Sequence, residues 1–388
     1  MKSDCVLIRG RVLGAECATD IVLKNGTVQS VARAGKSSAD LGSTASYIAP
    51  ALFDIQVNGV GGVTLQGERV LPDDVLRITR YLEARGVTRW VPTLITGSQE
   101  AMEHGCRVIA EAMREPAVAK AVPGLHLEGP YISPVDGPRG AHPKAFVRPP
   151  SLREFARLMK AAEGRVLYIT LAPEIPGAIE FIRAVTRRGV LVSLGHHHAD
   201  AEQVGRAVEA GARLSTHLGN GAASQIHRHQ NPLWPQLAED RLHASLIADL
   251  HHLPEPALKT FVRAKGPERT ILVSDCVDLT GMKPGVYDLF GASVELKPNG
   301  KICLRGTDLL AGSGLMLLQG VLNAWRATDL TLEEAFACAN VVPARLFGLK
   351  TPPMAQPGRK ANLVVFDVTR ENTPRVRAVV HDGALVIS

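Results

Sequence analysis

Aromatic side chains are scarce in this sequence, and its basic residues are not clustered. Phe, Trp and Tyr make up 4% of the 388 residues, while Lys and Arg number 44 against 38 for Asp and Glu. Nucleic-acid-binding proteins gather positive charge on one face and often interleave aromatic side chains on which bases stack. The scattered positive charge therefore argues against nucleic acid as a partner and leaves a mild field that could attract an anionic small molecule.

Cysteine and long apolar runs are scarce too. The six cysteines show no C-x-x-C pair, and they are Cys5, Cys17, Cys106, Cys276, Cys303 and Cys338. Such spacing predicts reduced core thiols in a cytoplasmic protein. No stretch approaches the run of about 18 apolar residues that a membrane span needs, and Lys2 and Asp4 precede an alternating strand rather than the apolar core of a signal peptide. We therefore expect a cytoplasmic protein without membrane contact.

Both ends of the chain have the pattern of short β strands. Asn25-Gly26 lies between two apolar runs, which is a strong hairpin signal, and Pro and Gly concentrate between residues 352 and 358. The strand-like runs lie at 6–12, 21–23, 28–31, 361–366 and 376–380. We predict that residues 1–48 and 351–388 form one small β-sandwich domain around a central domain of residues 49–350.

The central domain alternates between strand-like and helix-like segments. Apolar runs lie at 48–56, 88–94, 121–127, 166–171, 189–194, 212–216, 244–248 and 270–274. Amphipathic segments lie between them, for example at 73–85, 151–162, 177–188, 201–210 and 255–264. Eight strands alternating with helices predict an α/β fold, a (β/α)8 TIM-type barrel, in which functional groups lie at the C-terminal ends of the strands.

Three of these strand ends carry candidate metal ligands: Glu128, His196 and His217. Two imidazoles and a carboxylate with an open fourth position are typical of a catalytic metal site that lowers the pKa of water. We predict one divalent ion, Zn2+ in first place and Fe2+ as the alternative. A single histidine at a strand end would more often be a structural residue, and His197 and His198 compete with His196 for the ligand position.

Other polar residues near strand ends are candidates for catalysis and substrate binding. Asp275 ends the last strand and is the predicted general base and acid, with a turn-capping role as the alternative. His142 follows the Glu128 turn and is predicted to polarise a carbonyl or bind a hydroxyl, unless it is a surface histidine. His252 is a candidate substrate contact at the seventh strand, with His251 as its competitor.

Gln56 and Asn58 end the first barrel strand, at places where a His-x-His pair would supply ligands for a second metal. Because amides are poor zinc ligands, they favour a single-metal site with both residues near the substrate. The glycines that follow could offer backbone N–H groups to an anion, and a plain turn is the alternative.

The motifs together resemble the N-acetylglucosamine-6-phosphate deacetylase family of the amidohydrolase superfamily. The resemblance implies a barrel with a composite β-sandwich, usually a homodimer, that hydrolyses an N-acetyl group with a metal. Carried over by position, it places substrate contacts at Ala141, His142, Asn220, Gly221 and His252. The matching segments are 53–59, 126–130, 140–142, 170–174, 195–196, 216–220, 247–249, 272–275 and 358–363.

The sequence departs from the family pattern where the substrate phosphate would bind. His229 stands at the position of the usual arginine, and Arg228 lies one place before it. Asn220 is followed by Gly221-Ala222, and the usual Asp-Gly-x-His reads Asp249-Leu250-His251-His252. These changes leave the metal chemistry intact and concern the phosphate contact, for which Arg228 and His229 are the candidates.

The predicted function is removal of the N-acetyl group from an amino sugar, with N-acetylglucosamine-6-phosphate as the first candidate and glucosamine-6-phosphate and acetate as products. An unphosphorylated or different N-acyl sugar is the alternative within this class. A cyclic amide or an N-acyl amino acid is a second alternative, and a non-catalytic metal-binding scaffold is a third. The predicted partner is a small-molecule N-acyl amino sugar.

Overall fold

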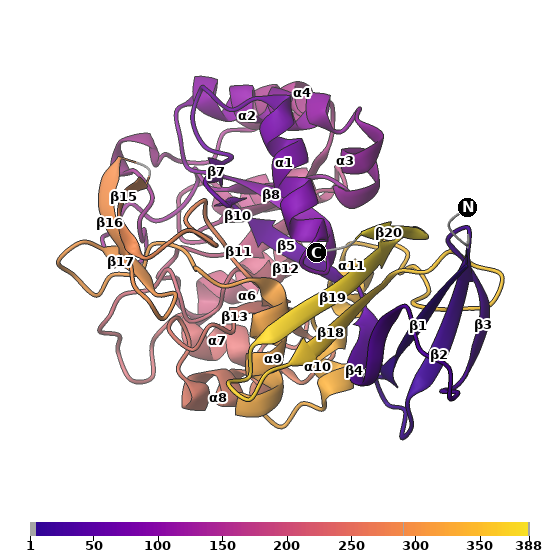
Figure 1. Ribbon diagram of the computed structural model, residues 1–388. Helices are drawn as coiled ribbons and strands as arrows, with labels where there is room; N and C mark the ends of the chain where they lie inside the picture. The colour runs from indigo at the N-terminus through magenta and orange to yellow at the C-terminus, as the bar shows by residue number, and fades with distance from the viewer. Residues whose placement is uncertain (1–4, 290, 387–388) are drawn as a thin grey trace.

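The computed structural model describes residues 5–289 and 291–386, and its centre is a barrel of eight parallel strands (Figure 1). Each continuous apolar run becomes a barrel strand because parallel strands are covered on both faces. The barrel strands are β5 (Leu52–Val57), β8 (Val87–Ile95), β9 (Leu125–Glu128), β10 (Val166–Leu171), β11 (Leu191–Leu194), β12 (Ala212–Ser215), β13 (His243–Ile247) and β14 (Thr270–Val273). The predicted TIM-type barrel is confirmed.

The barrel closes between β5 and β14 through a few main-chain hydrogen bonds. The N–H of Asp275 donates to the carbonyl of Gln56 at 3.1 Å, and the N–H of Asn58 donates to the carbonyl of Cys276 at 2.9 Å. This seam brings the ends of the first and last strands together, so polar residues from both lie at the same edge of the barrel mouth.

Amphipathic helices surround the barrel and bury one face against it. Side-chain caps begin several of them, as Ser151 does for α4 and Asp200 for α6. In the described ranges no helix has the length and hydrophobicity of a membrane span. The helices are α1 (Pro72–Glu83), α2 (Gln99–Ala112), α3 (Pro116–Ala121), α4 (Leu152–Ala161), α5 (Ala178–Thr186), α6 (Ala201–Ala210), α7 (Leu233–Ala238), α8 (Glu255–Lys265), α9 (Leu317–Ala327), α10 (Leu332–Ala337) and α11 (Val341–Leu346), with a 3-10 turn at Lys144–Phe146.

Strands from both chain ends form a separate seven-stranded sheet in the order β20-β19-β18-β4-β1-β2-β3. The predicted boundary after residue 48 falls inside β4, because the apolar run 48–56 divides at Ala51 between this sheet and the barrel. Residues 1–4 and 387–388, at the two ends of the predicted small domain, lie outside the described residues. The strands are β1 (Cys5–Val12), β2 (Thr19–Lys24), β3 (Thr27–Arg33), β4 (Leu41–Pro50), β18 (Leu363–Val368), β19 (Pro374–His381) and β20 (Ala384–Val386).

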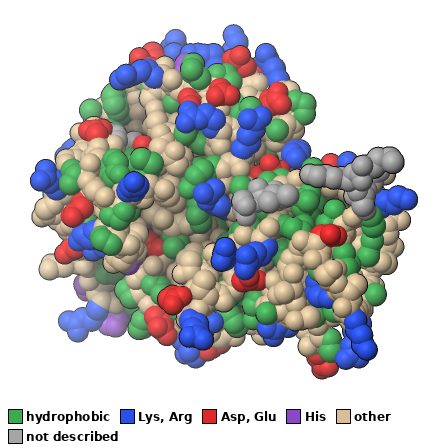
Figure 2. Space-filling model, viewed as in Figure 1, with side chains coloured by type: hydrophobic (Ala, Val, Ile, Leu, Met, Phe, Trp, Pro, Cys, Tyr) green, Lys and Arg blue, Asp and Glu red, His purple; other side chains and the backbone are tan. Residues whose placement is uncertain are grey.

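Two small antiparallel sheets complete the fold. One pairs β6 (Gly59–Val60) with β7 (Val63–Thr64), and the other joins β15 (Gly285–Leu289), β16 (Ala292–Leu296) and β17 (Ile302–Leu304). In Figure 1 the β15–β17 sheet lies on the left, opposite the terminal sheet on the right. Figure 2 shows Lys and Arg side chains distributed over the visible face among acidic ones, without a basic stripe.

Candidate metal centre and catalytic cavity

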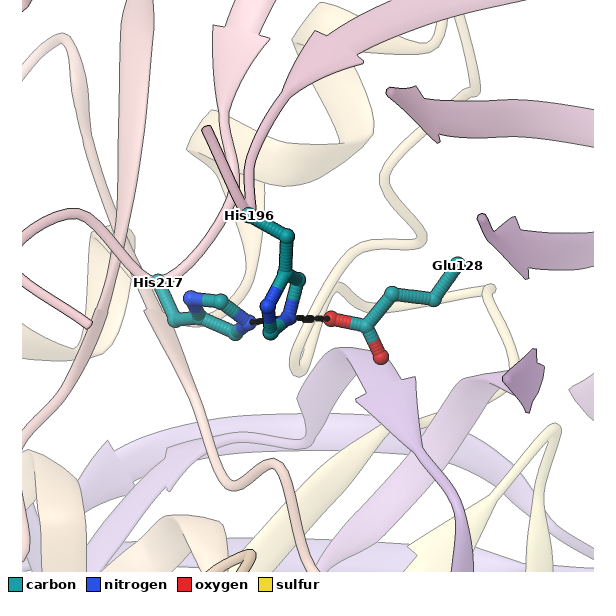
Figure 3. A group of neighbouring side chains, drawn as sticks. All are labelled: Glu128, His196 and His217. Carbon is teal, nitrogen blue, oxygen red and sulfur yellow. Dashed lines mark hydrogen bonds and ion pairs between the residues drawn. The ribbon is translucent and has the colours of Figure 1, made fainter. Parts of the chain in front are cut away.

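Glu128, His196 and His217 converge at the C-terminal ends of β9, β11 and β12. Figure 3 shows the two imidazoles pointing toward the carboxylate from the opposite side. Nε2 of His196 lies 3.2 Å and Nε2 of His217 lies 2.9 Å from Oε1 of Glu128, and the two Nε2 atoms are 3.1 Å apart. All three side chains are buried. Glu128 and His217 are 89 residues apart in the sequence, but the fold brings their donor atoms together in one compact set with that of His196.

The backbone turns sharply where these strands end. His196 has φ 52°, His217 has φ 31° and Asp275 has φ 51°, which is the left-handed region that residues with a Cβ rarely adopt. In each case the residue follows the last residue of a strand by two positions. The turn lets the side chain enter the barrel mouth while the main chain leaves toward the next helix.

The surroundings of the three residues suit a metal ion. Nδ1 of His196 lies 3.0 Å from the carbonyl of Pro138, which only a protonated Nδ1 can satisfy, so Nε2 keeps a lone pair for a ligand bond. Nε2 of Gln56 donates to Oε1 of Glu128 at 3.1 Å. Neutral imidazole and carboxylate donors that lie within 4.8 Å of one another are a set that Zn2+ and Fe2+ both accept. The residues present fit a divalent cation.

The charges of these groups depend on one another. In the absence of a metal ion, burial would raise the pKa of Glu128, but the hydrogen bonds and the positive charge that His196 and His217 supply when they are protonated hold this pKa well below its usual range. Burial would lower the pKa of His217, but the bond to Glu128 and its charge raise this pKa above the usual value. The carboxylate is therefore ionised, as a metal ligand has to be.

Asp275 lies beside this set and is positioned by the barrel seam. Nδ2 of Asn58 donates to Oδ1 of Asp275 at 2.8 Å. Burial and the negative charge of Glu128 raise the pKa of Asp275 to about 7. A carboxylate whose pKa lies near neutrality is well suited to exchange a proton during catalysis.

His142 and His252 are both held through one ring nitrogen. Nδ1 of His142 lies 2.9 Å from the hydroxyl of Thr96, and burial keeps the pKa of His142 well below its usual range. Nδ1 of His252 lies 2.7 Å from Oδ2 of Asp249. His251 instead bonds the carbonyl of Asn299 at 3.1 Å, so the structure places His252 and not its neighbour at the cavity.

A cavity of about 460 Å³ opens at the barrel mouth and brings most of the predicted site together. Its lining includes all three candidate ligands and seven further predicted residues, namely Asn58, Ala141, His142, Asn220, Gly221, His252 and Asp275. Gln56 lies just outside it, against Glu128. Neither His197 nor His198 is among the lining residues. The volume is within the range of small-molecule sites.

Arg228 and His229 lie on the surface and are not among the lining residues. The carbonyl of Arg228 accepts a hydrogen bond from Nε1 of Trp234 at 2.9 Å, and Nδ2 of Asn231 donates to the carbonyl of His227, also at 2.9 Å. These bonds fold residues 227–231 into a turn at the surface. Among the described residues that line the cavity, none is Lys or Arg.

Sequence reasoning did not find Thr96, Asp308 or the carbonyl of Pro138 as parts of this site. Thr96 orients His142, the carbonyl of Pro138 orients His196, and Asp308 lines the cavity from the segment after β17. A hydroxyl at the end of β8 was the one available signal, because β8 also ends at the barrel mouth. The other two contacts come from loops whose paths no local pattern fixes.

Comparison with known proteins agrees with this geometry. Residues 47–386 match the model of the Amidohydrolase family. The chain is 35% identical to human N-acetylglucosamine-6-phosphate deacetylase, over 87% of this chain and 83% of that protein, and 31% identical to N-acetylgalactosamine-6-phosphate deacetylase of Escherichia coli O157:H7, over 83% and 84%. The solved N-acetyl-D-glucosamine-6-phosphate deacetylase of Mycobacterium smegmatis superposes with a TM-score of 0.86 at 30% identity, covering 98% of this chain and 100% of the other.

Proposed function

Because this chain belongs to the amidohydrolase family, we propose that it is a metal-dependent deacetylase that hydrolyses the N-acetyl group of an amino sugar phosphate. N-acetylglucosamine-6-phosphate is the first candidate substrate, with glucosamine-6-phosphate and acetate as products. The observation that carries the proposal is the buried Glu128, His196 and His217 set with Asp275 beside it in one cavity. Proteins named as deacetylases of amino sugar phosphates match most of this chain.

The mechanism divides the work between the metal ligands and Asp275. A divalent ion held by the three ligands would lower the pKa of water and polarise the amide carbonyl. Asp275 accepts the proton of the attacking water and later delivers it to the departing amine. Asn58 bonds Oδ1 of Asp275, which leaves Oδ2 for that proton.

The remaining residues bind and orient the substrate. Nδ1 of His142 is held by Thr96, which leaves Nε2 for the acetyl oxygen or a sugar hydroxyl. Nδ2 of Asn220 is buried without a hydrogen-bond partner among the described residues, so it is available to a sugar hydroxyl. His252 is fixed by Asp249 and contacts the sugar from the side of β13, and the backbones of Ala141 and Gly221 complete the contacts.

We further propose that the ion is Zn2+, with Fe2+ as the alternative, and that the protein is a cytoplasmic homodimer. The His2Glu set is common to both ions. Four buried cysteines are free thiols, as a reducing compartment would keep them; they are Cys106, Cys276, Cys303 and Cys338. Metal analysis and light scattering on the purified protein test the ion and the oligomeric state.

The experiment that tests the proposal is acetate release by the zinc-loaded protein. We expect kcat/KM for N-acetylglucosamine-6-phosphate to exceed that for N-acetylglucosamine by about 100-fold, equivalent to about 2.7 kcal/mol of transition-state binding. Equal values would favour an unphosphorylated sugar. No acetate from either would contradict the proposal and turn attention to a cyclic amide or an N-acyl amino acid.

N-acetylgalactosamine-6-phosphate is the second candidate substrate, because one of the relatives is named for it. It should be measured alongside, since the two sugars differ only in one hydroxyl configuration. If Arg228 or His229 binds the phosphate, then Arg228→Gln or His229→Gln lowers kcat/KM for the phosphorylated sugars and leaves that for N-acetylglucosamine unchanged.

A further inference from the structure

Strand β10 lies between two strands that end in metal ligands but supplies none itself. In the barrel sheet its neighbours are β9, which ends at Glu128, and β11, whose exit carries His196. The chain leaves β10 through Ala172 and Pro173 to Glu174. Glu174 takes no part in the proposed mechanism. Its side chain is nevertheless largely buried, with 7% of its surface exposed.

Glu174 connects the exits of the two flanking strands. Its Oε1 accepts the backbone N–H of His198 at 3.0 Å and lies 3.0 Å from Nδ1 of the same residue. That nitrogen also lies 3.0 Å from the hydroxyl of Ser133, on the β9 side. The backbone N–H of Ser133 in turn donates to the carbonyl of His196 at 2.9 Å. The closed set of contacts therefore includes the main chain of a ligand.

The cluster is built for a fixed geometry. Ser133 is fully buried, and Oε2 of Glu174 is buried without a hydrogen-bond partner in the part of the chain that the structure describes. Burying Oε2 of Glu174 without a hydrogen bond costs free energy. The contacts of Oε1 with His198 therefore have to hold the carboxylate in place. Because His196 has φ 52°, its backbone depends on such external contacts to stay in the left-handed region.

We propose that Glu174 is a positioning residue for the metal centre, which acts by fixing the main chain of residues 196–198 against Ser133. The inference rests on the metal site of the proposed function. Glu174 touches neither the ion nor the substrate, and it acts through His196. Residues that orient metal ligands in this way change metal affinity by about 10- to 100-fold when they are replaced.

The test is the metal affinity of Glu174→Ala, measured by equilibrium dialysis of Zn2+ against a chelator of known affinity. We expect zinc binding to weaken by about 10- to 100-fold. In Glu174→Gln the amide oxygen still accepts the N–H of His198, so we expect binding within about threefold of the wild type, which would separate positioning from a need for charge. Unchanged zinc affinity in Glu174→Ala would overturn the inference.

Glu83 provides the matched control because it is another largely buried glutamate bonded to a histidine, with its side chain 13% exposed. Its Oε1 lies 2.7 Å from Nδ1 of His381, where α1 meets the terminal sheet, away from the barrel mouth. We expect Glu83→Ala to lower the melting temperature and leave zinc affinity unchanged. An equal loss of zinc affinity in Glu83→Ala would show that the effect is general destabilisation and would overturn the inference.

Two further measurements keep the test decisive. If Glu174→Ala does not fold, Glu174→Asp is measured in its place. The shorter side chain of Glu174→Asp keeps the charge but cannot reach the N–H of His198. An unchanged zinc affinity in Glu174→Asp would also overturn the inference. A wild-type protein that binds one zinc ion but releases no acetate would contradict the proposed function alone. The failure of each proposal is therefore distinguishable.

Discussion

Asp275 is the residue on which the proposed chemistry depends most directly. Asp275→Asn keeps the size of the side chain but cannot accept a proton, so we expect kcat to fall by about 100- to 10,000-fold with zinc content unchanged. Steady-state acetate release and metal analysis measure the two effects. Asp278→Asn is the matched control, because Asp278 lies on the same segment but is not among the residues that line the cavity. Full activity in Asp275→Asn would contradict the mechanism.

The pH dependence of activity follows from the same carboxylate. Without a metal ion, burial and the charge of Glu128 raise the pKa of Asp275 to about 7, so the group becomes protonated below that pH. A bound cation favours the ionised form and moves this pKa downward. We therefore expect kcat/KM of the zinc enzyme to fall on the acid side below pH 7. If the residual activity of Asp275→Asn falls at low pH in the same way as that of the wild type, the fall is caused by the titration of another group.

At this scale the sequence was most informative where a residue type and a strand end coincide. Glu128, His196, His217 and Asp275 each follow an apolar run, and parallel strands bring such ends to one face. The partners that orient them were not predictable in the same way. Glu174 meets His198 because two loops approach each other, and no local pattern determines that approach.

The segment between β17 and α9 lines the cavity with a carboxylate. Asp308 lies 2.9 Å from Nζ of Lys301, and its side chain is 92% exposed. A carboxylate at the rim repels a phosphate, and in water this repulsion is below about 1 kcal/mol. We expect Asp308→Asn to lower KM for N-acetylglucosamine-6-phosphate by about two- to fourfold and to leave that for N-acetylglucosamine unchanged.

The control for this effect is Asp382→Asn, which removes another surface carboxylate that is paired with a lysine. Oδ2 of Asp382 lies 3.2 Å from Nζ of Lys360, and Asp382 is in the turn between β19 and β20 of the terminal sheet. An equal fall of KM for both sugars in Asp308→Asn, or the same change in Asp382→Asn, would show that phosphate repulsion at the rim is not the cause.

Elements with a strong period or a continuous apolar run were predicted well, and those without were missed. The eight barrel strands and helices such as α6 lie within a few residues of their predicted positions. The β15–β17 sheet was not predicted, because its strands are short and only five of their 13 residues are buried, while Val286 is 52% exposed. Their few buried side chains pack in a small cluster with Val277, Leu279 and Ala311, which leaves only a short apolar pattern in the sequence.

For the whole molecule, the terminal sheet and the barrel share a hydrophobic core. Phe366 on β18 is fully buried and stacks on two other rings. Its ring centroid lies 5.5 Å from that of Tyr47 and 5.7 Å from that of Phe336 on α10. We expect Phe366→Ala to lower the free energy of unfolding by about 3–5 kcal/mol, because it leaves a cavity between the two parts. Urea unfolding followed by fluorescence and circular dichroism measures the loss and tests whether one transition remains.

The control is Phe146→Ala, since the side chain of Phe146 is 40% exposed and we expect little change. A first transition that unfolds only the terminal sheet in Phe366→Ala would contradict the shared core. Because of the shared core, the apolar pattern of the sequence does not mark the point where the sheet ends and the barrel begins. Residues on both sides of Ala51 are buried, so the apolar pattern continues from one part into the other.

The left-handed turns at the ends of the strands set activity against heat resistance. Holding a side-chain-bearing residue such as Asp275 at φ 51° costs about 1–2 kcal/mol, and glycine would avoid most of that cost. We expect metal-free Asp275→Gly to melt about 1–3 °C above Asp275→Ala while both are inactive, as differential scanning calorimetry would show. The barrel therefore stays below the thermal stability that its topology permits, and variants selected only for heat resistance would tend to lose catalysis at these positions first.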